Sequence, residues 1–154
     1  MSDGYRPAVG VMLLNAENKV WVGQRLDNSL EAWQMPQGGL DEGEEPFEGA
    51  LRELEEETGI ARHLVELLAQ AKEELTYDLP EDLIGKVWKE KWRGQRQSWF
   101  LMRFLGEDVD VNIATPEPEF RAWKWAEPQA LPDLIVPFKQ GLYRDVLKAF
   151  AAWL

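Results

Sequence analysis

Three glutamates, Glu53, Glu56 and Glu57, are spaced i, i+3, i+4 in a strongly acidic stretch of the chain. At 100° per residue of an α-helix, these positions fall within an arc of about 100° on one helical face. Carboxylates crowded together resist ionisation unless a cation lies among them, and oxygen ligands of this kind suit Mg²⁺ or Mn²⁺. The spacing predicts a divalent-cation site; a solvated acidic face is the alternative.

The acidity of the chain is concentrated around these glutamates. The formal net charge is −11, and residues 38–60 hold nine acidic side chains against one basic side chain, Arg52. Like charges packed this closely repel one another and destabilise a helix unless they are neutralised. Most of the negative charge therefore lies in one short segment, and a bound cation would neutralise part of it.

The residue types that are missing narrow the possible chemistry. The chain has no cysteine, which excludes disulfides, thiolate zinc sites, iron–sulfur clusters and cysteine nucleophiles. Its single histidine, His63, leaves no basis for a Ser-His-Asp triad or a multi-histidine metal site. No Gly-x-x-x-x-Gly-Lys-Ser/Thr sequence is present, so a P-loop is excluded as well. Any catalysis must rest on carboxylates, arginines and lysines.

The composition indicates one globular domain over residues 1–154. A hydrophobic fraction of 45% with 29% charged residues is typical of a folded, soluble chain. No apolar run approaches the roughly 18 residues of a membrane span, and no basic and apolar segments of a secretory signal are visible. We therefore expect a cytoplasmic protein with no membrane partner. Nothing in the sequence indicates its oligomeric state.

Two helices are expected. The first begins near Pro46, which suits a first helical turn, and is ended by Gly59, which suits the C′ position. Its apolar residues recur at i, i+3, i+4 and i+7, and the second helix, after Pro137, carries apolar residues four apart. These two apolar faces comprise Phe47, Ala50, Leu51 and Leu54 in the first helix, and Phe138, Leu142, Val146 and Phe150 in the second.

The rest of the chain favours β-strands. Strands are expected at residues 9–14, 19–25, 64–77, 98–105 and 122–125, although residues 66–74 also suit a helix. Residues 33–39 and 78–91 are expected to be irregular. Strands interrupted by two helices, without regular βαβ alternation, predict an α/β fold with helices on the faces of a mixed sheet.

The acidic segment contains a run of residues with the fixed spacing of a known motif. Gly38 is followed after five residues by Glu44, and residues 52–60 read Arg-Glu-Leu-Glu-Glu-Glu-Thr-Gly-Ile. This resembles the Nudix box, Gly-x5-Glu-x7-Arg-Glu-U-x-Glu-Glu-x-Gly-U, where U is aliphatic, and matches it at every fixed position. By this resemblance the chain is identified as a member of the Nudix family. The resemblance implies an α/β/α sandwich around a mixed β-sheet, formed by a single Nudix domain.

Short segments outside the box resemble the Nudix subfamily of RNA pyrophosphohydrolases and dinucleoside polyphosphate (diadenosine tetraphosphate) hydrolases. The resemblance implies hydrolysis of a pyrophosphate link with Mg²⁺, for which Mn²⁺ would substitute. One departure is Ser98, where the subfamily usually carries Lys. The matching segments are residues 5–7, 33–39, 77–80, 94–95, 99–100, 119–120, 123–125 and 136–139.

The resemblance also implies roles for individual residues. The metal ions would be bound by Glu53, Glu56 and Glu57, with Gly38 and Glu119 as further ligands. Glu119 is alternatively the general base, or an exposed loop acid. Four residues of the motif are expected to be structural, namely Gly39, Glu44, Arg52 and Gly59, and Arg52 is expected to pair with Glu48 or Glu44.

The same subfamily pattern suggests six substrate-binding residues. Arg6, Arg25 and Lys139 are candidates for phosphate contacts, since guanidinium and ammonium groups bind phosphate oxygens. Tyr77 and Phe138 are candidates for stacking on a base, with core packing as the alternative. Gln95 is a candidate for contact with the nucleotide or its polyphosphate chain.

Two substrates stay open, the triphosphorylated 5′ end of RNA and diadenosine tetraphosphate. The net charge of −11 and the lack of a basic tail after Leu154 argue against a long RNA. Residues 86–103 argue for it, because six bases and one acid alternate there with tryptophans. A solvated strand edge explains that segment equally well. A Nudix-fold binding or regulatory module without catalysis is the alternative function, which the complete set of box glutamates disfavours.

Overall fold

The computed structural model describes residues 4–26, 31–88 and 92–154. Its strands are β1 (Tyr5–Leu14), β2 (Val20–Arg25), β3 (Trp33–Gln34), β4 (Gln37–Gly39), β5 (Val65–Gln70), β6 (Leu75–Asp78), β7 (Gly94–Phe104) and β8 (Phe120–Ala126). Its α-helices are α1 (Pro46–Thr58), α2 (Leu131–Leu134) and α3 (Gln140–Ala149), and short 3-10 turns link several elements. None of these helices is long and apolar enough to cross a membrane.

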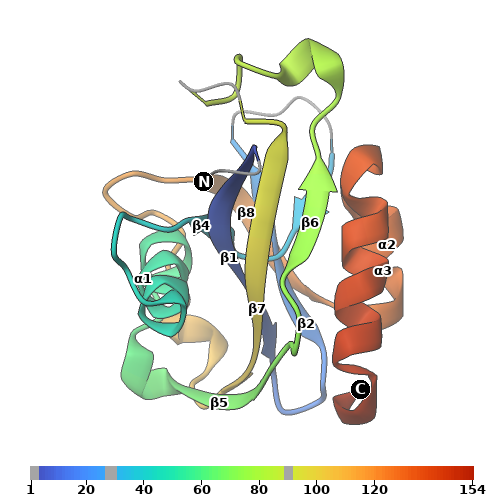
Figure 1. Ribbon diagram of the computed structural model, residues 1–154. Helices are drawn as coiled ribbons and strands as arrows, with labels where there is room; N and C mark the ends of the chain where they lie inside the picture. The colour runs from blue at the N-terminus through green and yellow to red at the C-terminus, as the bar shows by residue number, and fades with distance from the viewer. Residues whose placement is uncertain (1–3, 27–30, 89–91) are drawn as a thin grey trace.

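The described strands form one mixed sheet. The order β3-β2-β1-β7-β5 makes up the main path, while β4 pairs with β1, β6 with β7 and β8 with β2. The pairing of β1 with β7 is parallel along all of β1, and the other pairings are antiparallel. One face of the sheet is covered by α1 and the other by α2 and α3 (Figure 1). The expected α/β/α sandwich is therefore confirmed.

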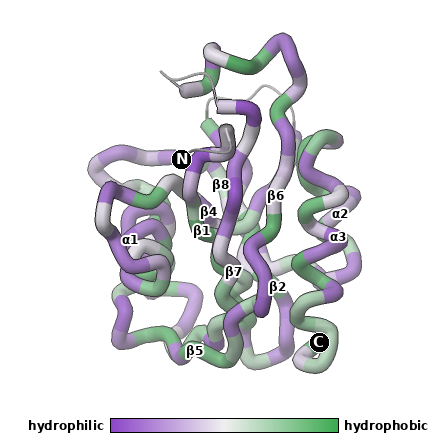
Figure 2. Tube along the Cα trace, viewed as in Figure 1, coloured by the Kyte–Doolittle hydropathy of each residue, from purple (hydrophilic) through white to green (hydrophobic). Residues whose placement is uncertain are grey.

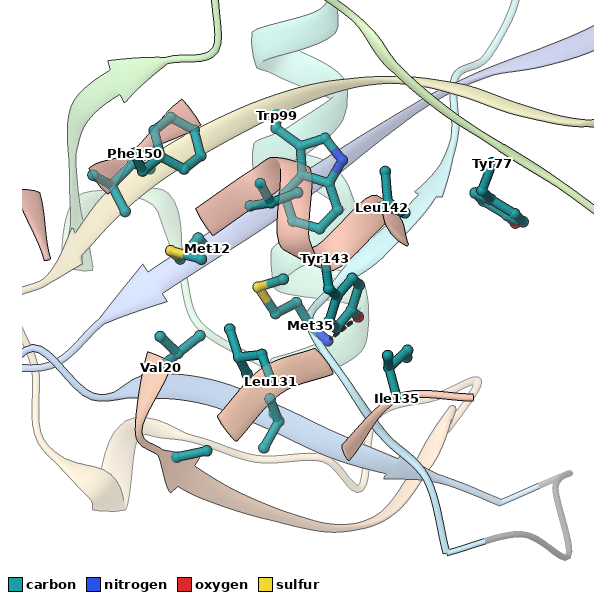
Figure 3. Packing of buried hydrophobic residues seen from close by; sticks show 14 of the residues in the cluster. Met12, Val20, Met35, Tyr77, Trp99, Leu131, Ile135, Leu142, Tyr143 and Phe150 are labelled. Atoms are coloured by element: carbon teal, nitrogen blue, oxygen red, sulfur yellow. Dashed lines mark hydrogen bonds between the residues drawn. The ribbon is translucent and has the colours of Figure 1, made fainter. Parts of the chain in front are cut away.

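Each face of the sheet has its own hydrophobic core. Val11 of β1 packs with residues of α1, whereas its neighbour Met12 packs with residues of α3. Figure 3 shows the α3-side core, in which Trp99 of β7 and Tyr143 of α3 lie close together, with ring centroids 6.3 Å apart. Because helices cover both faces, β1 is apolar and buried without interruption from Ala8 to Leu14. Hydrophilic residues are frequent in α1 (Figure 2), and its Glu48, Glu55 and Glu56 are exposed.

The sheet splits beside β1, and β4 lies in the split. Only Leu14 of β1 pairs with β2, at Val20, whereas residues 8–10 of β1 pair with β4. The short strand β4 directly precedes the loop into α1. This arrangement brings the first half of β1, the glycines of β4 and one face of α1 into the same region.

The helix α1 begins and ends at the signals expected from the sequence. The Glu45 carboxylate accepts a hydrogen bond from the backbone N–H of Glu48 at 3.1 Å, and Pro46 occupies the first turn. At the other end Gly59 has φ 74°, and its N–H donates to Glu55. A side chain there would be strained and would also approach the Asn112 carbonyl oxygen within 2.8 Å. The acidic face is thus built on a helix with well-defined ends.

Several expected strands and loops were wrong in their bounds. Residues 33–39 are not wholly irregular, since they contain β3 and β4. Residues 64–77 form two strands rather than one, because β5 and β6 pair with different parts of β7. The strand β7 begins at Gly94 instead of residue 98, and β1 at Tyr5 instead of residue 9. The last helix is preceded by α2 and by a 3-10 turn over Pro137–Lys139.

Candidate active site

One cavity of about 730 Å³ collects most of the residues singled out in the sequence. It lies where β1 and β7 begin, because the paired residues Arg6 and Gln95 both line it. All six substrate-binding candidates line this cavity: Arg6, Arg25, Tyr77, Gln95, Phe138 and Lys139. Four acidic-site candidates line it as well: Gly38, Glu53, Glu57 and Glu119.

Glu56 is the acid that does not face this cavity. It lines a neighbouring acidic groove between α1 and the loop that precedes β8, and its side chain is 58% exposed. Three acids line both spaces, namely Glu53, Glu57 and Glu119. These three carboxylates therefore lie on the boundary between the groove and the cavity.

Arg52 holds the acidic face together. Its guanidinium donates to both oxygens of Glu44 at 2.7 and 2.8 Å, to Glu53 at 2.9 Å and to Glu56 at 3.1 Å. It also donates to the Gly39 carbonyl oxygen at 3.1 Å, which ties β4 to α1. These bonds lower the pKa of Glu44 to about 2. Of the two partners expected for Arg52, Glu44 is the one found.

Glu57 and Glu53 are the buried carboxylates of the face. Glu57 is 3% exposed, and its Oε2 accepts a hydrogen bond from the backbone N–H of Gln37 at 3.0 Å. Burial raises the pKa of Glu57 well above its usual range, and the charges of Glu53 and Glu119 raise it further. Burial also raises the pKa of Glu53 to about 7, against the lowering effect of Arg52. Both groups would ionise more readily beside a cation.

The glycines of β4 let side chains from both faces of the sheet approach the backbone. A Cβ on Gly38 would lie 2.2 Å from Cδ of Glu53. A Cβ on Gly39 would lie 2.3 Å from a guanidinium nitrogen of Arg6. Successive residues of a strand face opposite sides, so Gly38 leaves room for Glu53 on one side of β4 and Gly39 leaves room for Arg6 on the other. The acids of α1 can therefore border a cavity that lies on the α3 side.

The donors fit a divalent metal in their chemistry. They are carboxylate oxygens and a backbone carbonyl, without nitrogen or sulfur, as Mg²⁺ and Mn²⁺ prefer. In the described residues no three acidic side chains are close enough together to hold an ion. Arg52 accounts for part of this, because its hydrogen bonds occupy oxygens of Glu53 and Glu56. Binding of an ion would require these side chains to turn from the arginine.

Glu119 reaches the site from the segment before β8. A register shift in the pairing of β2 with β8 falls between Gln24 and Arg25, opposite the start of β8. Arg25 pairs with Glu119 across this irregularity, with 3.6 Å between Nη2 and Oε2. The Glu119 side chain is 43% exposed. This acid is therefore more exposed than Glu53 and Glu57, the two buried carboxylates of α1.

Aromatic and cationic groups form the wall opposite the acids. The rings of Tyr77 and Phe138 have centroids 6.0 Å apart, and Lys139 Nζ lies 4.9 Å from the Tyr77 ring centroid. Burial of the Lys139 ammonium lowers its pKa to about 8, and the charge of Arg25 contributes in the same direction. Tyr77 is 7% exposed and lies at the edge of the α3-side core (Figure 3), so it belongs to both the core and the cavity wall.

Trp88 and Gln37 are among the cavity residues that the sequence did not assign to the site. Trp88 lines the cavity, and the guanidinium carbon of Arg6 lies 5.4 Å from its ring centroid. Gln37 lines the cavity from β4. Both belong to segments expected to be irregular, where no periodicity indicates the direction of a side chain.

The basic segment 86–103 contributes little charge to this cavity. Among its described cations only Lys86 lines the cavity. Arg96 pairs with Glu74 at 3.3 Å, Arg93 with Asp78 at 3.9 Å, and Arg103 donates to the Asn15 carbonyl oxygen at 2.6 Å. Lys89, Glu90 and Lys91 lie outside the described residues. The described arginines of this segment act as structural partners.

Comparisons with known proteins agree on the family. The family model described as NUDIX domain matches residues 4–146. The RNA pyrophosphohydrolase of Sphingopyxis alaskensis is 59% identical over 146 residues, covering 95% of this chain and 92% of that protein. The protein of the same name from Zymomonas mobilis is 58% identical over 148 residues, covering 96% of each.

Solved structures share the fold at low sequence identity. A C. elegans Ap4A hydrolase in a binary complex matches with a TM-score of 0.69 and 21% identity, over 97% of this chain and 99% of that chain. The E. coli dihydroneopterin triphosphate pyrophosphohydrolase matches with a TM-score of 0.72 and 21% identity, over 94% and 98%. At such identities the likeness establishes the fold alone.

Proposed function

Because the chain belongs to the Nudix family, we propose that it hydrolyses the pyrophosphate link of a 5′-polyphosphorylated nucleotide, with the triphosphorylated 5′ end of RNA as substrate. The observation that carries the proposal is a cavity in which acids face cations and aromatic rings. Relatives that are 50–59% identical over nearly their whole length are named RNA pyrophosphohydrolases, which supports this choice of substrate. An RNA substrate also agrees with the expected cytoplasmic location.

The acids would bind divalent metal, for which Mg²⁺ is the proposed ion and Mn²⁺ a substitute. Bound to a polyphosphate, such an ion neutralises negative charge and lowers the pKa of water. Glu53, Glu57 and the Gly38 carbonyl would hold it from the cavity side, with Glu56 joining from the groove. Glu119, whose side chain is half exposed, would complete the site or take the proton of the attacking water.

The opposite wall would bind the substrate. Arg6, Arg25 and Lys139 offer positive charge to phosphate oxygens, while Tyr77 and Phe138 offer a ring surface to the first base. Water then adds across one P–O–P bond, which releases pyrophosphate and leaves a 5′-monophosphate end. The residues hold the phosphates between the acids of α1 and these cations. Neither a binding-only role nor a regulatory role is favoured, since every acid of the box is in place.

Product analysis tests this proposal. Short RNA with a 5′-triphosphate and diadenosine tetraphosphate should be compared at equal enzyme concentration, with Mg²⁺ and with excess EDTA. We expect pyrophosphate release from RNA with Mg²⁺ and none with EDTA. Faster turnover of diadenosine tetraphosphate would reassign the substrate, and full activity in excess chelator would overturn the metal-assisted mechanism.

A further inference from the structure

A group of hydrogen-bonded amides lies between the cavity and the α3-side core. Gln95, Gln97 and Trp99 alternate along β7, so their side chains share one face of the sheet. The two glutamines are 2% and 1% exposed, and Trp99 is fully buried. Gln37 of β4 joins them from across β1, where Gly10 leaves room for the indole. Buried amides of this kind must find partners or lose stability.

Trp99 fixes the direction of the hydrogen bonds in this group. The indole Nε1–H is a donor only, and it donates to Oε1 of Gln97 at 2.8 Å. The amide of Gln97 therefore points its NH₂ group the other way. That NH₂ group donates to Oε1 of Gln95 at 2.7 Å and to Oε1 of Gln37 at 3.1 Å. An NH₂ group has two hydrogens, so both are used.

The consequence appears at the cavity wall. Gln95 and Gln37 both present their carbonyl oxygens to Gln97, which leaves their own NH₂ groups for other partners. Both residues line the cavity, and within the described part of the chain neither NH₂ group has a hydrogen-bond partner. The wall thus presents two amide donors. Gln37 also donates its backbone N–H to Glu57 at 3.0 Å, which links the group to the acids.

We propose that Gln97 is a positioning residue, which turns Gln95 and Gln37 so that the cavity presents two amide donors to oxygen acceptors of the substrate. The inference rests on the proposed function, since a polyphosphorylated nucleotide is rich in such oxygens. The acceptors are phosphate oxygens or carbonyl oxygens of a base. Gln97 itself is nearly fully buried and acts through its neighbours.

The substitution Gln97→Glu should reverse the direction of the hydrogen bonds that residue 97 makes with Gln95 and Gln37. A carboxylate still accepts from the indole, but it can no longer donate, so Gln95 and Gln37 must donate to it and turn their oxygens to the cavity. Losing two donors toward charged oxygens should raise KM about ten- to hundredfold, with kcat within about twofold. The control Gln97→Met keeps the volume and leaves both amides free to turn, so its KM should rise less.

Two further measurements make the outcome decisive. Calorimetry with inorganic triphosphate needs no turnover, so weaker binding by Gln97→Glu supports the inference even if the proposed reaction fails. Triphosphorylated RNAs that begin with guanosine or adenosine identify the acceptor. An equal rise in KM for both RNAs assigns it to phosphate, and a larger rise for guanosine assigns it to the base carbonyl.

A purely structural role for Gln97 predicts a different result. Both variants would then melt at lower temperature and keep the KM and the triphosphate affinity of the wild type, which would overturn the inference. If Gln97→Glu does not fold, the KM and the triphosphate affinity of Gln97→Met alone test the inference. Unchanged KM and unchanged triphosphate affinity in that variant would also overturn it.

Discussion

The carboxylate of Glu53 lies against the backbone of Gly38, at a distance that leaves no room for a side chain on the glycine. A Cβ there would come within 2.2 Å of Cδ and 2.3 Å of Oε2 of the glutamate. The acid is also held by Arg52 from the other side, at 2.9 Å. The position of this carboxylate is therefore set jointly by a missing side chain and a guanidinium.

The substitution Gly38→Ala should displace Glu53 and remove most activity. The added methyl group overpacks the contact, which should lower stability by about 1–3 kcal/mol. Loss of the proposed metal-binding position of Glu53 should lower kcat more than this loss of stability explains. Thermal melting and kcat at saturating Mg²⁺, measured on one preparation, check both effects.

Gly141→Ala is the matched control for that change. Nothing lies within 4 Å of a Cβ at this position in α3, and alanine favours helix over glycine by about 0.5–1 kcal/mol. We expect wild-type activity and equal or higher stability. A Gly38→Ala protein as active as Gly141→Ala would contradict the placement of the acids beside β4.

The raised pKa of Glu53, about 7 in the metal-free protein, makes stability depend on pH. The folded protein binds a proton at Glu53 more tightly than the unfolded chain, whose carboxyl titrates near 4.5. The resulting stability is present below pH 4.5 and is lost as the pH rises to about 7. Burial acts on Glu57 in the same direction.

Melting of the metal-free protein between pH 4.5 and 7.5 checks this effect. In EDTA the melting temperature should fall across that range, and Glu53→Gln should flatten part of the fall. Glu55→Gln removes one charge from the same helix without touching Gln37 or Arg52, and serves as control. Added Mg²⁺ or Mn²⁺ should raise the melting temperature most at the upper end, through binding to the ionised acids. Equal slopes in all three proteins would exclude Glu53 as their source.

The fold and the acidic face could be predicted from the sequence because local signals define them. Pro46, Gly59 and the spacing of the apolar residues between them specify α1. The rest of the fold was inferred from the resemblance of the acidic motif to the Nudix box. The start of β7 could not be predicted in this way. Gln95 and Gln97 are polar residues, yet they are as buried as core residues. A search for apolar residues misses them and therefore places the start of the strand at residue 98. Their partners across the sheet decide their burial.

The same limit applies to the cavity wall. The pairing of Gln37 with Gly10, and of Gly39 with Ala8, depends on contacts distant in the sequence, which no local pattern of residues 33–39 contains. Trp88 likewise reaches the cavity through its contact with Arg6. Candidate residues could be named from the resemblance, but the hydrogen bonds that orient them required the structure.

Tyr77 and Phe138 should respond differently to truncation, although their rings are neighbours. Tyr77 is nearly fully buried and belongs to the α3-side core, so Tyr77→Ala should lower stability by about 3–5 kcal/mol as well as affinity. Phe138 is only half buried in its 3-10 turn, so Phe138→Ala should raise KM with a smaller loss of stability. Loss of base stacking should correspond to about 1–3 kcal/mol of binding.

Melting temperature and KM, determined together, separate these effects. Exposed Trp153, on the C-terminal 3-10 turn, provides Trp153→Ala as a control aromatic truncation away from the cavity. If Phe138→Ala kept the wild-type KM and lost stability like Tyr77→Ala, both rings would be core residues and the base would bind elsewhere.

Changing each acid to glutamine should distinguish metal ligands from a general base by the effects on metal affinity and kcat. Glu57→Gln can still accept the N–H of Gln37 and keeps its buried volume, so the fold should persist while one negative charge is lost. Because that charge would belong to the proposed metal site, Mn²⁺ affinity and kcat should fall together. Glu53→Gln and Glu56→Gln should show the same paired loss to some degree.

Glu119→Gln should fall between a ligand and a general base. Loss of a general base lowers kcat by about 10²–10⁴ and leaves metal affinity nearly intact. The Glu119 side chain is 43% exposed and pairs with Arg25, so it would turn to the proposed metal once substrate neutralised the arginine. Calorimetry with Mn²⁺ and kcat at saturating metal measure the two quantities, with Glu117→Gln of the same loop as control. If Glu57→Gln bound Mn²⁺ and turned over like the wild type, the metal site would not lie on α1.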